Sequence, residues 1–436
     1  MKLRRIYLYL LLLFFITIGF AHNYHGAAIA MSNQNNWKGW VVTIDTGLVL
    51  HTPNSGVTWI SQSFLTSRYF FDVFFLDSLQ GWIGTDQGFI YYTDDGGDYW
   101  STQVMGLAKH AARIFFIDED YGWAACGGAI VGQTIDGGAT WAQLFLQYPP
   151  FHLDTVDLYG IHFINRLKGW FCAGRYPEYI ESIPGVGDTW FTRGQGYIAV
   201  SNDGGDTWQL QKRDTVYDYF DLRFKDLSNG YVVGGNDRTN AGIIFKTTTG
   251  GQSWQSVTNI PSQAKILRAV EWVGNHLWAV GRNGTIIHSS NNGSTWSTQQ
   301  SNVDTTLFDV DFCDTLHGLV SGNGCVLYTN NGGDTWQTAN IEGIQEININ
   351  LLSNSKFKIS AFPNPFHFHV TLQKPVEHTL KIYSVVGNLI RVFNSGTSTV
   401  TWDGKDNYGR FVPAGVYFAT IRTKKNLSVI PIIYQK

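Results

Sequence analysis

Seven copies of one eight-residue motif recur along this 436-residue chain and constrain its fold more than any other feature. Most copies read Ser/Thr-x-Asp/Asn-x-Gly-x-Thr/Ser-Trp. They occupy residues 52–59, 93–100, 134–141, 201–208, 247–254, 289–296 and 329–336. Tandem self-similarity of this kind is the signature of a repeat architecture, in which each unit must pack on its neighbours.

Each position of the motif has a role in a tight hairpin. The third-position Asp or Asn accepts hydrogen bonds from backbone N–H groups just ahead of it, which builds an Asx-type turn. The fifth-position Gly supplies a positive φ, and the Trp opens the next strand with a large apolar face. We interpret the third-position residues as structural; they are Asn54, Asp95, Asp136, Asp203, Asn291 and Asn331. The fifth copy departs, with Thr249 in this place.

A second sequence pattern precedes most copies of the motif. It consists of an alternating aromatic segment, a polar turn, Gly-Trp and a short apolar segment, as in residues 73–85. Such alternation predicts half-buried β-strands. One repeat therefore predicts a four-stranded antiparallel sheet of roughly 40 residues. Seven such sheets predict an all-β fold with a seven-bladed β-propeller over about residues 24–352. Residues 29–33 and 347–352 compete for the innermost strand of the first blade.

Composition and charge exclude several classes of protein. Charged residues make up 15% of the chain and hydrophobic ones 44%, which is not a disordered composition. Residues 22–354 carry 17 basic and 31 acidic side chains, and so acidic a body repels nucleic acid. The four cysteines show no C-x-x-C spacing and are interpreted as small buried hydrophobes. No metal site or cofactor is predicted.

The chain is expected to have three regions. Residues 1–21 predict a signal peptide, because three basic residues precede a fifteen-residue apolar run and a small-residue cleavage site. That run is short for a membrane span, and no later segment is longer, so the mature chain should have no transmembrane segment. Residues 22–354 form the propeller. Residues 355–436, with short alternating strands and Gly/Asp turns, predict a small C-terminal β-sandwich, Ig-like in type.

The eight-residue motif resembles the Asp-box, or BNR repeat. Its pairing with an aromatic strand and Gly-Trp resembles the propeller of the photosystem II stability and assembly factor family. The resemblance covers about three quarters of the chain and implies the propeller fold. It implies little about function, because Asp-boxes occur in many unrelated proteins.

The C-terminal region resembles the type A sorting domain of type IX secretion. The resemblance rests on Phe362-Pro363-Asn364-Pro365-Phe366, Ile382-Tyr383, Trp402-Asp403-Gly404 and the segment 413–418. It implies passage through the periplasm and delivery to the outer cell surface or the medium, with the type IX secretion machinery as a partner. Residues 356–436 carry 11 basic and 3 acidic side chains, which would suit docking to an acidic surface.

Spacing between the repeats locates a candidate binding site. Extra residues occur in the approach to the fourth blade and in the loops between the second and third strands of the fourth and fifth blades. Strands alternate in direction, so these insertions share the face opposite the Asp-boxes. Their Tyr, Trp and Arg residues are of the types enriched at binding hot spots. The candidate ligand-binding residues are Arg175, Tyr176, Tyr179, Trp190, Phe191, Arg193 and Arg238.

We therefore predict an exported, non-catalytic propeller that binds an extracellular protein or glycan. The alternative for the insertion is a loop that packs on itself and binds no ligand. The alternative function is an extracellular glycoside hydrolase, sialidase-like or other. The Arg-Ile-Pro segment of sialidases is missing, because Phe115 follows Arg113 and Ile114. Glu178, Glu181 and Asp188 could supply paired carboxylates. Acids clustered on one loop are more often solvated, so no catalytic residue is assigned.

Overall fold

The computed structural model describes most of the repeat region and parts of the C-terminal region. The described residues are 24–33, 36–44, 47–62, 68–106, 110–146, 156–174, 195–341, 359–362, 369–373, 380–384, 389–393, 399–412, 415–422 and 427–434. They contain β-strands and no helix, so none of them forms a helix able to cross a membrane. The chain divides into two compact units, residues 1–344 and residues 345–436.

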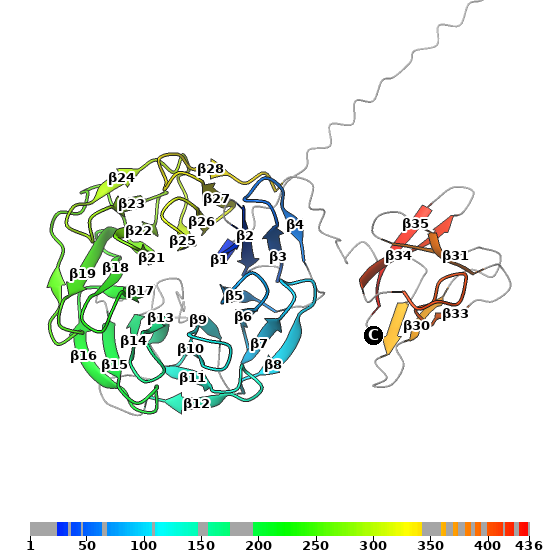
Figure 1. The fold of residues 1–436 in the computed structure, drawn as a ribbon, viewed down its shortest axis with the longest axis horizontal. Helices are drawn as coiled ribbons and strands as arrows, with labels where there is room; N and C mark the ends of the chain where they lie inside the picture. The colour runs from blue at the N-terminus through cyan, green and yellow to red at the C-terminus, as the bar shows by residue number, and fades with distance from the viewer. Residues whose placement is uncertain are drawn as a thin grey trace, which may run out of the picture. The chain divides into compact units, whose positions relative to one another are not determined.

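The first unit contains seven four-stranded antiparallel sheets, which confirms the predicted seven-bladed propeller (Figure 1). The first three blades comprise β1 (Tyr24–Asn33), β2 (Asn36–Thr43), β3 (Val49–Thr52), β4 (Ile60–Ser61); β5 (Phe70–Phe75), β6 (Gly81–Thr85), β7 (Phe89–Thr93), β8 (Ser101–Val104); and β9 (Ala111–Phe116), β10 (Gly122–Cys126), β11 (Ile130–Thr134), β12 (Ala142–Phe145).

The remaining four blades follow the same order. They comprise β13 (Asp157–Phe163), β14 (Gly169–Gly174), β15 (Gly196–Ser201), β16 (Gln209–Asp214); β17 (Asp218–Phe224), β18 (Gly230–Asn236), β19 (Ala241–Thr247), β20 (Gln255–Ser256); β21 (Leu267–Val273), β22 (His276–Gly281), β23 (Ile286–Ser289), β24 (Ser297–Gln299); and β25 (Leu307–Phe312), β26 (Gly318–Gly322), β27 (Cys325–Thr329), β28 (Gln337–Thr338). The first strand of each blade lies innermost (Figure 1).

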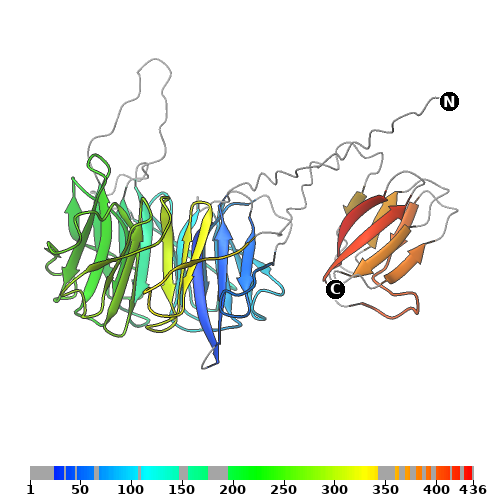
Figure 2. The same cartoon turned by 90° about the horizontal axis from the view of Figure 1, so that it is seen from above.

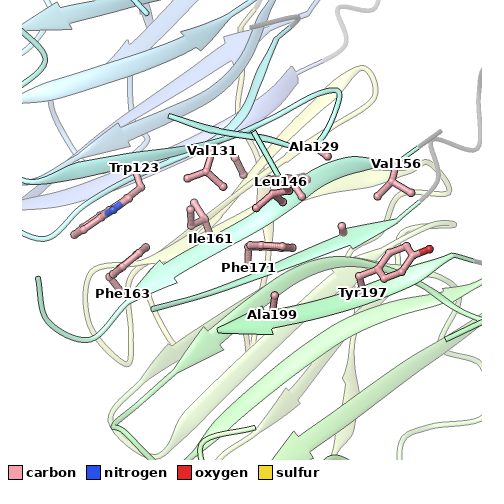
Figure 3. Close-up of a cluster of buried hydrophobic side chains, with 13 residues drawn as sticks. Trp123, Ala129, Val131, Leu146, Val156, Ile161, Phe163, Phe171, Tyr197 and Ala199 are labelled. Carbon is pink, nitrogen blue, oxygen red and sulfur yellow. The ribbon is translucent and has the colours of Figure 1, made fainter. Parts of the chain in front are cut away.

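Seven apolar clusters hold the described blades together, and each cluster draws side chains from two neighbouring blades. The cluster between blades three and four is drawn in Figure 3. There Trp123 stacks on Phe163 with ring centroids 3.6 Å apart. No blade buries both of its faces alone, so the ring is the unit that excludes water.

A tryptophan on the second strand latches five of the blades to the next one. Each ring stacks on a phenylalanine of the following blade at 3.5–3.7 Å between centroids. Each indole N–H also donates to the fourth-position glycine carbonyl of that blade's Asp-box. These residues are Trp40, Trp82, Trp123, Trp170 and Trp278. In the fifth blade the hydroxyl of Tyr231 replaces the indole and donates to the carbonyl of Asn292 at 2.8 Å.

The Asp-box turns are held by side-chain hydrogen bonds. In the second blade Oδ1 of Asp95 accepts from the backbone N–H of Tyr99 at 2.9 Å and from the Thr93 hydroxyl at 2.8 Å. The divergent fifth copy keeps this geometry, because the Thr249 hydroxyl accepts from the backbone N–H of Ser253 at 3.0 Å. A hydroxyl with no charge thus occupies the place of the carboxylate.

Strand β1 closes the ring by packing against the seventh blade. Backbone N–H groups of β1 donate to side chains of β25, from Ala27 to Asp309 at 3.1 Å and from Ile29 to Asp311 at 2.8 Å. Figure 2 shows the blue strands of the first blade beside the yellow strands of the seventh. The innermost strand of the first blade is therefore N-terminal; the competing segment 347–352 lies outside the described residues.

The second unit contains two antiparallel sheets. One comprises β29 (Ile359–Phe362), β30 (His369–Gln373) and β33 (Thr399–Trp402), and the other β31 (Leu380–Ser384), β32 (Leu389–Phe393), β34 (Gly415–Arg422) and β35 (Leu427–Tyr434). One buried cluster includes Trp402 from the first sheet with Leu380, Ile382 and Tyr417 from the second. Trp402 also donates from its indole N–H to the carbonyl of Lys405, which closes the Trp-Asp-Gly turn.

Candidate functional site

Every innermost strand of the propeller carries a β-bulge near its start. The pairing with the second strand skips one residue in each blade, and a bulge of this kind re-aims the side chain of the skipped residue. The skipped residues, here called the bulge ring, are His25, Phe71, Ala112, Tyr159, Phe220, Arg268 and Phe308. All seven line one cavity of about 60 Å³.

The bulge ring surrounds the central channel on the face opposite the Asp-boxes. First and third strands run in the same direction, so the Asp-boxes, which follow third strands, lie at the far end from the starts of the first strands. This is the face to which the sequence assigns the inserted loops.

The side chains of the bulge ring form two arcs of stacked groups. In one arc His25 stacks on Phe308 at 4.7 Å between centroids and lies edge-on to Phe71 at 6.1 Å. In the other, the guanidinium of Arg268 lies 4.3 Å over the ring of Phe220. Burial lowers the pKa of His25 to about 4, and the charges of Arg268 and Arg113 act in the same direction. His25 is therefore a neutral aromatic ring at physiological pH.

Beneath the bulge ring, Arg113 binds three aspartates from three other blades. Its guanidinium lies 2.8 Å from Asp309, 3.3 Å from Asp72 and 3.4 Å from Asp221. We call these four residues the Arg113 cluster. Its side chains are nearly buried, with Arg113 12% exposed and Asp221 fully covered. Burial opposes the charge on Arg113, but the aspartates outweigh it and hold the pKa of Arg113 well above its usual value.

The same aspartates also fasten neighbouring innermost strands. Asp72 accepts from the backbone N–H of Ile114 at 2.6 Å, and Asp221 accepts from that of Val270 at 3.1 Å. Asp309 makes the equivalent bond to β1 described above. Every blade except the fourth therefore contributes to one buried network, which divides the channel into two cavities because Asp72, Arg113 and Asp309 line both.

Glycine permits the innermost strands to approach this closely. A Cβ on Gly26 would lie 2.7 Å from the backbone nitrogen of Val73, and a Cβ on Gly160 would lie 3.0 Å from the Cα of Asp221. Neither contact could be relieved by a side-chain rotation, since both involve backbone atoms. These positions therefore hold glycine where four of the other five blades hold Asp or Arg.

The structure describes one of the seven predicted ligand-binding residues, Arg238. It is exposed in the turn between β18 and β19, where its backbone N–H donates to the Asn236 side chain at 2.9 Å. Its neighbour Asp237 pairs with Arg282 at 2.9 Å. The other six predicted residues, Arg175, Tyr176, Tyr179, Trp190, Phe191 and Arg193, lie outside the described residues, as do Glu178, Glu181 and Asp188.

Sequence reasoning missed the bulge ring and the Arg113 cluster. A signal for the cluster exists, because Phe/Tyr-Phe-Asp or Leu-Phe-Asp recurs at residues 70–72, 219–221 and 307–309. A charged residue in the middle of an otherwise apolar strand requires a buried partner. Arg113 appeared in the sequence only as part of an incomplete sialidase-like segment, and the pattern gives no indication that one guanidinium meets three of these acids.

One further group of ligand-type side chains converges within the described residues. Atoms of Cys313, Asp314 and His317 lie within 4.8 Å of one another on the turn between β25 and β26. Asp314 already accepts from the backbone N–H groups of Leu316 and His317 at 2.7 and 2.8 Å. It therefore caps the turn. All four cysteines are free thiols in the structure, and three of them are buried.

Comparison with known families finds two partial matches. Residues 57–150, which cover blades two and three, match the family described as photosynthesis system II assembly factor YCF48. Residues 227–365 match the DUF6242 β-propeller domain family. The photosystem II assembly lipoprotein Ycf48 of Synechococcus sp. (strain CC9902) is 27% identical over 92 residues, which are 21% of this chain and 26% of that protein. The match thus spans about a quarter of that relative's length.

Solved structures share the fold at low sequence identity. YCF48 from Cyanidioschyzon merolae is 17% identical with a TM-score of 0.53, covering 72% of this chain and 97% of that one. A YCF48 protein bound to a D1 peptide is 16% identical with a TM-score of 0.51, covering 71% of this chain and 93% of that one. The chain is thus a seven-bladed propeller that is similar, over its second and third blades, to the YCF48 assembly factor.

Proposed function

We propose that this protein is a non-catalytic binding propeller whose bulge ring receives a segment of a partner protein. The main support is that seven separate bulges turn their side chains, six of them large, into one small cavity at the channel mouth. A core needs no such arrangement, because the blades already bury their faces on one another. A cavity of about 60 Å³ fits a single side chain, so the ring would anchor one residue of the partner.

The comparisons support a protein as the partner. The matching family and the curated relative are named for assembly of photosystem II, and one structure of similar fold holds a D1 peptide. The predicted export address argues against a photosystem role for this chain. We therefore propose an extracellular protein partner. Binding of glycans, and not of peptides, would identify a glycan partner instead.

Selection from a random peptide library displayed on phage tests this proposal. Peptides enriched on the full-length protein should lose about ten-fold or more in affinity when Phe71 and Phe308 are replaced by Ala. Phe145→Ala is the matched control, because this ring is 49% exposed on an outermost strand. Binding that survives the Phe71/Phe308 change, or that fails equally with the control, would remove the bulge ring from the function.

We further propose that residues 1–21 direct export from the cytoplasm and that residues 355–436 are a β-sandwich sorting domain for type IX secretion. Support comes from the motif order, the basic charge and the buried cluster shared by its two sheets. A carrier protein fused to residues 355–436 should reach the medium or the cell surface of a host with this secretion system. Retention in the periplasm would contradict the assignment, as would equal export without these residues.

The alternative function is glycoside hydrolysis. It requires two carboxyl groups flanking the scissile bond. In the Arg113 cluster the three aspartates are bound to guanidinium and backbone N–H groups, which leaves the sequence candidates Glu178, Glu181 and Asp188. Release of sugar from a polysaccharide panel, lost on Glu178→Gln and Glu181→Gln, would replace the binding proposal.

A further inference from the structure

The channel contains a second cavity, of about 250 Å³, on the Asp-box side of the Arg113 cluster. We call it the acid-lined cavity. Its charged walls are Asp72, Arg113, Arg223, Glu271, Asp309 and Asp311. Among the residues described, carboxyl groups thus outnumber guanidinium groups by four to two. Buried charge of one sign is costly unless a counter-charge offsets it.

Among the described residues, Asp311 is the carboxyl of this cavity that forms no ion pair. Its one described hydrogen bond comes from the backbone N–H of Ile29 at 2.8 Å. Arg223, whose guanidinium lines the same cavity, instead pairs with Asp221 and with Glu271, each at 3.1 Å. Burial, and then the negative charge of Glu271, raise the pKa of Asp311 to about 8. The group therefore holds a proton at neutral pH where a cation could take its place.

His162 provides a second, independent group that faces the cavity without a partner. Its Nδ1 atom is buried, and no hydrogen-bond partner lies near it within the described part of the chain. Burial lowers the pKa of His162 to about 3, with Arg223 acting in the same direction, so the imidazole is neutral. A neutral imidazole nitrogen can accept a hydrogen bond from an N–H donor. The neighbouring ring of Phe115 lies 4.8 Å away between centroids.

The arrangement suits an organic cation better than a metal ion. A metal needs several ligand atoms around one point, and among the described residues the only group that converges in this way is the turn at Cys313, outside this cavity. Separated carboxyls with aromatic walls, here Phe74, Phe115 and Trp272, instead match an ammonium group on an alkyl chain.

We propose that the acid-lined cavity binds an alkylammonium group, either a lysine side chain of a partner or a free diamine. The ammonium would pair with the ionised Asp311, and the alkyl stem would lie against the aromatic walls. This site lies at the opposite end of the channel from the bulge ring, with the Arg113 cluster between them. The amine-binding proposal can therefore be refuted or supported independently of the peptide-binding proposal.

Isothermal titration of the full chain with two amines tests the proposal. Cadaverine represents a free diamine, and a capped Gly-Lys-Gly peptide represents a lysine side chain; the same peptide with acetylated lysine is the neutral control. We expect one or both amines to bind at millimolar concentration or better, and the acetylated peptide not to bind. Whichever amine binds more tightly identifies the source of the cation.

The pH dependence and two variants complete the test. Binding must displace the Asp311 proton, so affinity should rise between about pH 6 and pH 8 and protons should be released to the buffer. Glu271, Asp309, Asp72, Arg113, Arg223 and His162 face the same cavity, so their charges set the size of this effect. Asp311→Asn, which preserves the uncharged shape, should weaken binding at least ten-fold and remove most of the proton release, leaving only the part that comes from Asp72, whose pKa burial raises to about 7. Asp94→Asn, an exposed acid, is the charge-matched control.

Two results would overturn the proposal. One is the absence of binding by both amines at any pH tested. The other is equal affinity for wild type and Asp311→Asn, each folded as judged by circular dichroism. Proton release measured on the wild type in buffers of different ionisation enthalpy needs no variant, so a binding event without it would also contradict the role of Asp311.

Discussion

Replacing Arg113 by Met should destabilise the propeller more than replacing any other buried charged residue. Met keeps much of the side-chain volume but leaves Asp72 and Asp309 without their cation, and Asp221 with Arg223 alone. Because Arg113 is only 12% exposed, water cannot replace the lost partner. Breaking a buried ion pair by removing one member costs about 3–5 kcal/mol, and we expect a loss of this size in the free energy of unfolding.

The loss should depend on pH in a defined direction. Burial raises the pKa of Asp72 to about 7 although the charge of Arg113 lowers it, so without Arg113 the pKa of Asp72 should rise further above its value in the unfolded chain. The folded state then holds protons that the unfolded state releases, so its stability falls as pH rises through that interval. The variant should therefore lose less at about pH 5 than at about pH 8.

Urea unfolding followed by tryptophan fluorescence measures both effects. Arg166→Met is the control, because this arginine also binds an aspartate, at 2.7 Å, but its side chain is 51% exposed. Exposed pairs contribute little, so the control should unfold like the wild type. A loss below about 1 kcal/mol for Arg113→Met, or an equal loss at both pH values, would refute the reasoning that this cluster binds the blades together.

Three further predictions concern the turns, the latches and the channel. Thr249→Asp restores the charged acceptor of the fifth Asp-box and should raise the free energy of unfolding by about 0.5–1 kcal/mol, measured by urea titration; a loss would show that this turn prefers the hydroxyl. Tyr231→Phe leaves the carbonyl of Asn292 without its donor and should cost about 1 kcal/mol in the same assay, whereas no change would remove the latch role. Between about pH 6.5 and 8, above the interval in which the buried histidines gain stability with pH, the free energy of unfolding should fall as pH rises, because the folded state keeps the Asp311 proton; Asp311→Asn should flatten this slope, and an unchanged slope would reassign the titration.

Much of the propeller could be predicted from the sequence because its signals are local and repeated. The Asp-box turn is specified within eight residues, and alternation fixes which strand faces are buried. The Trp latches follow the same period. The ends of the repeat carry no such signal, which is why the innermost strand of the first blade was left open between two segments and the structure assigns it to β1.

The channel could not be predicted because it depends on how distant strands meet. Arg113 and Asp309 are 196 residues apart, and only closure of the ring brings them within 2.8 Å. The bulges are equally hidden, since each skip breaks the alternation of buried positions, as in β5, but the sequence does not show which residue is skipped until the pairing is known. His25, Phe71 and Tyr159 therefore read as ordinary strand residues until the pairing is known.

Hydrogen–deuterium exchange of the full chain, with and without a peptide selected on it, tests most directly that this is a binding propeller whose channel mouth is the site. The account predicts protection at the starts of the innermost strands, around Phe71, Tyr159, Phe220 and Phe308, and unchanged exchange in the Asp-box turns. Protection confined to the Asp-box turns or to the outermost strands, with the channel mouth unaffected, would contradict it.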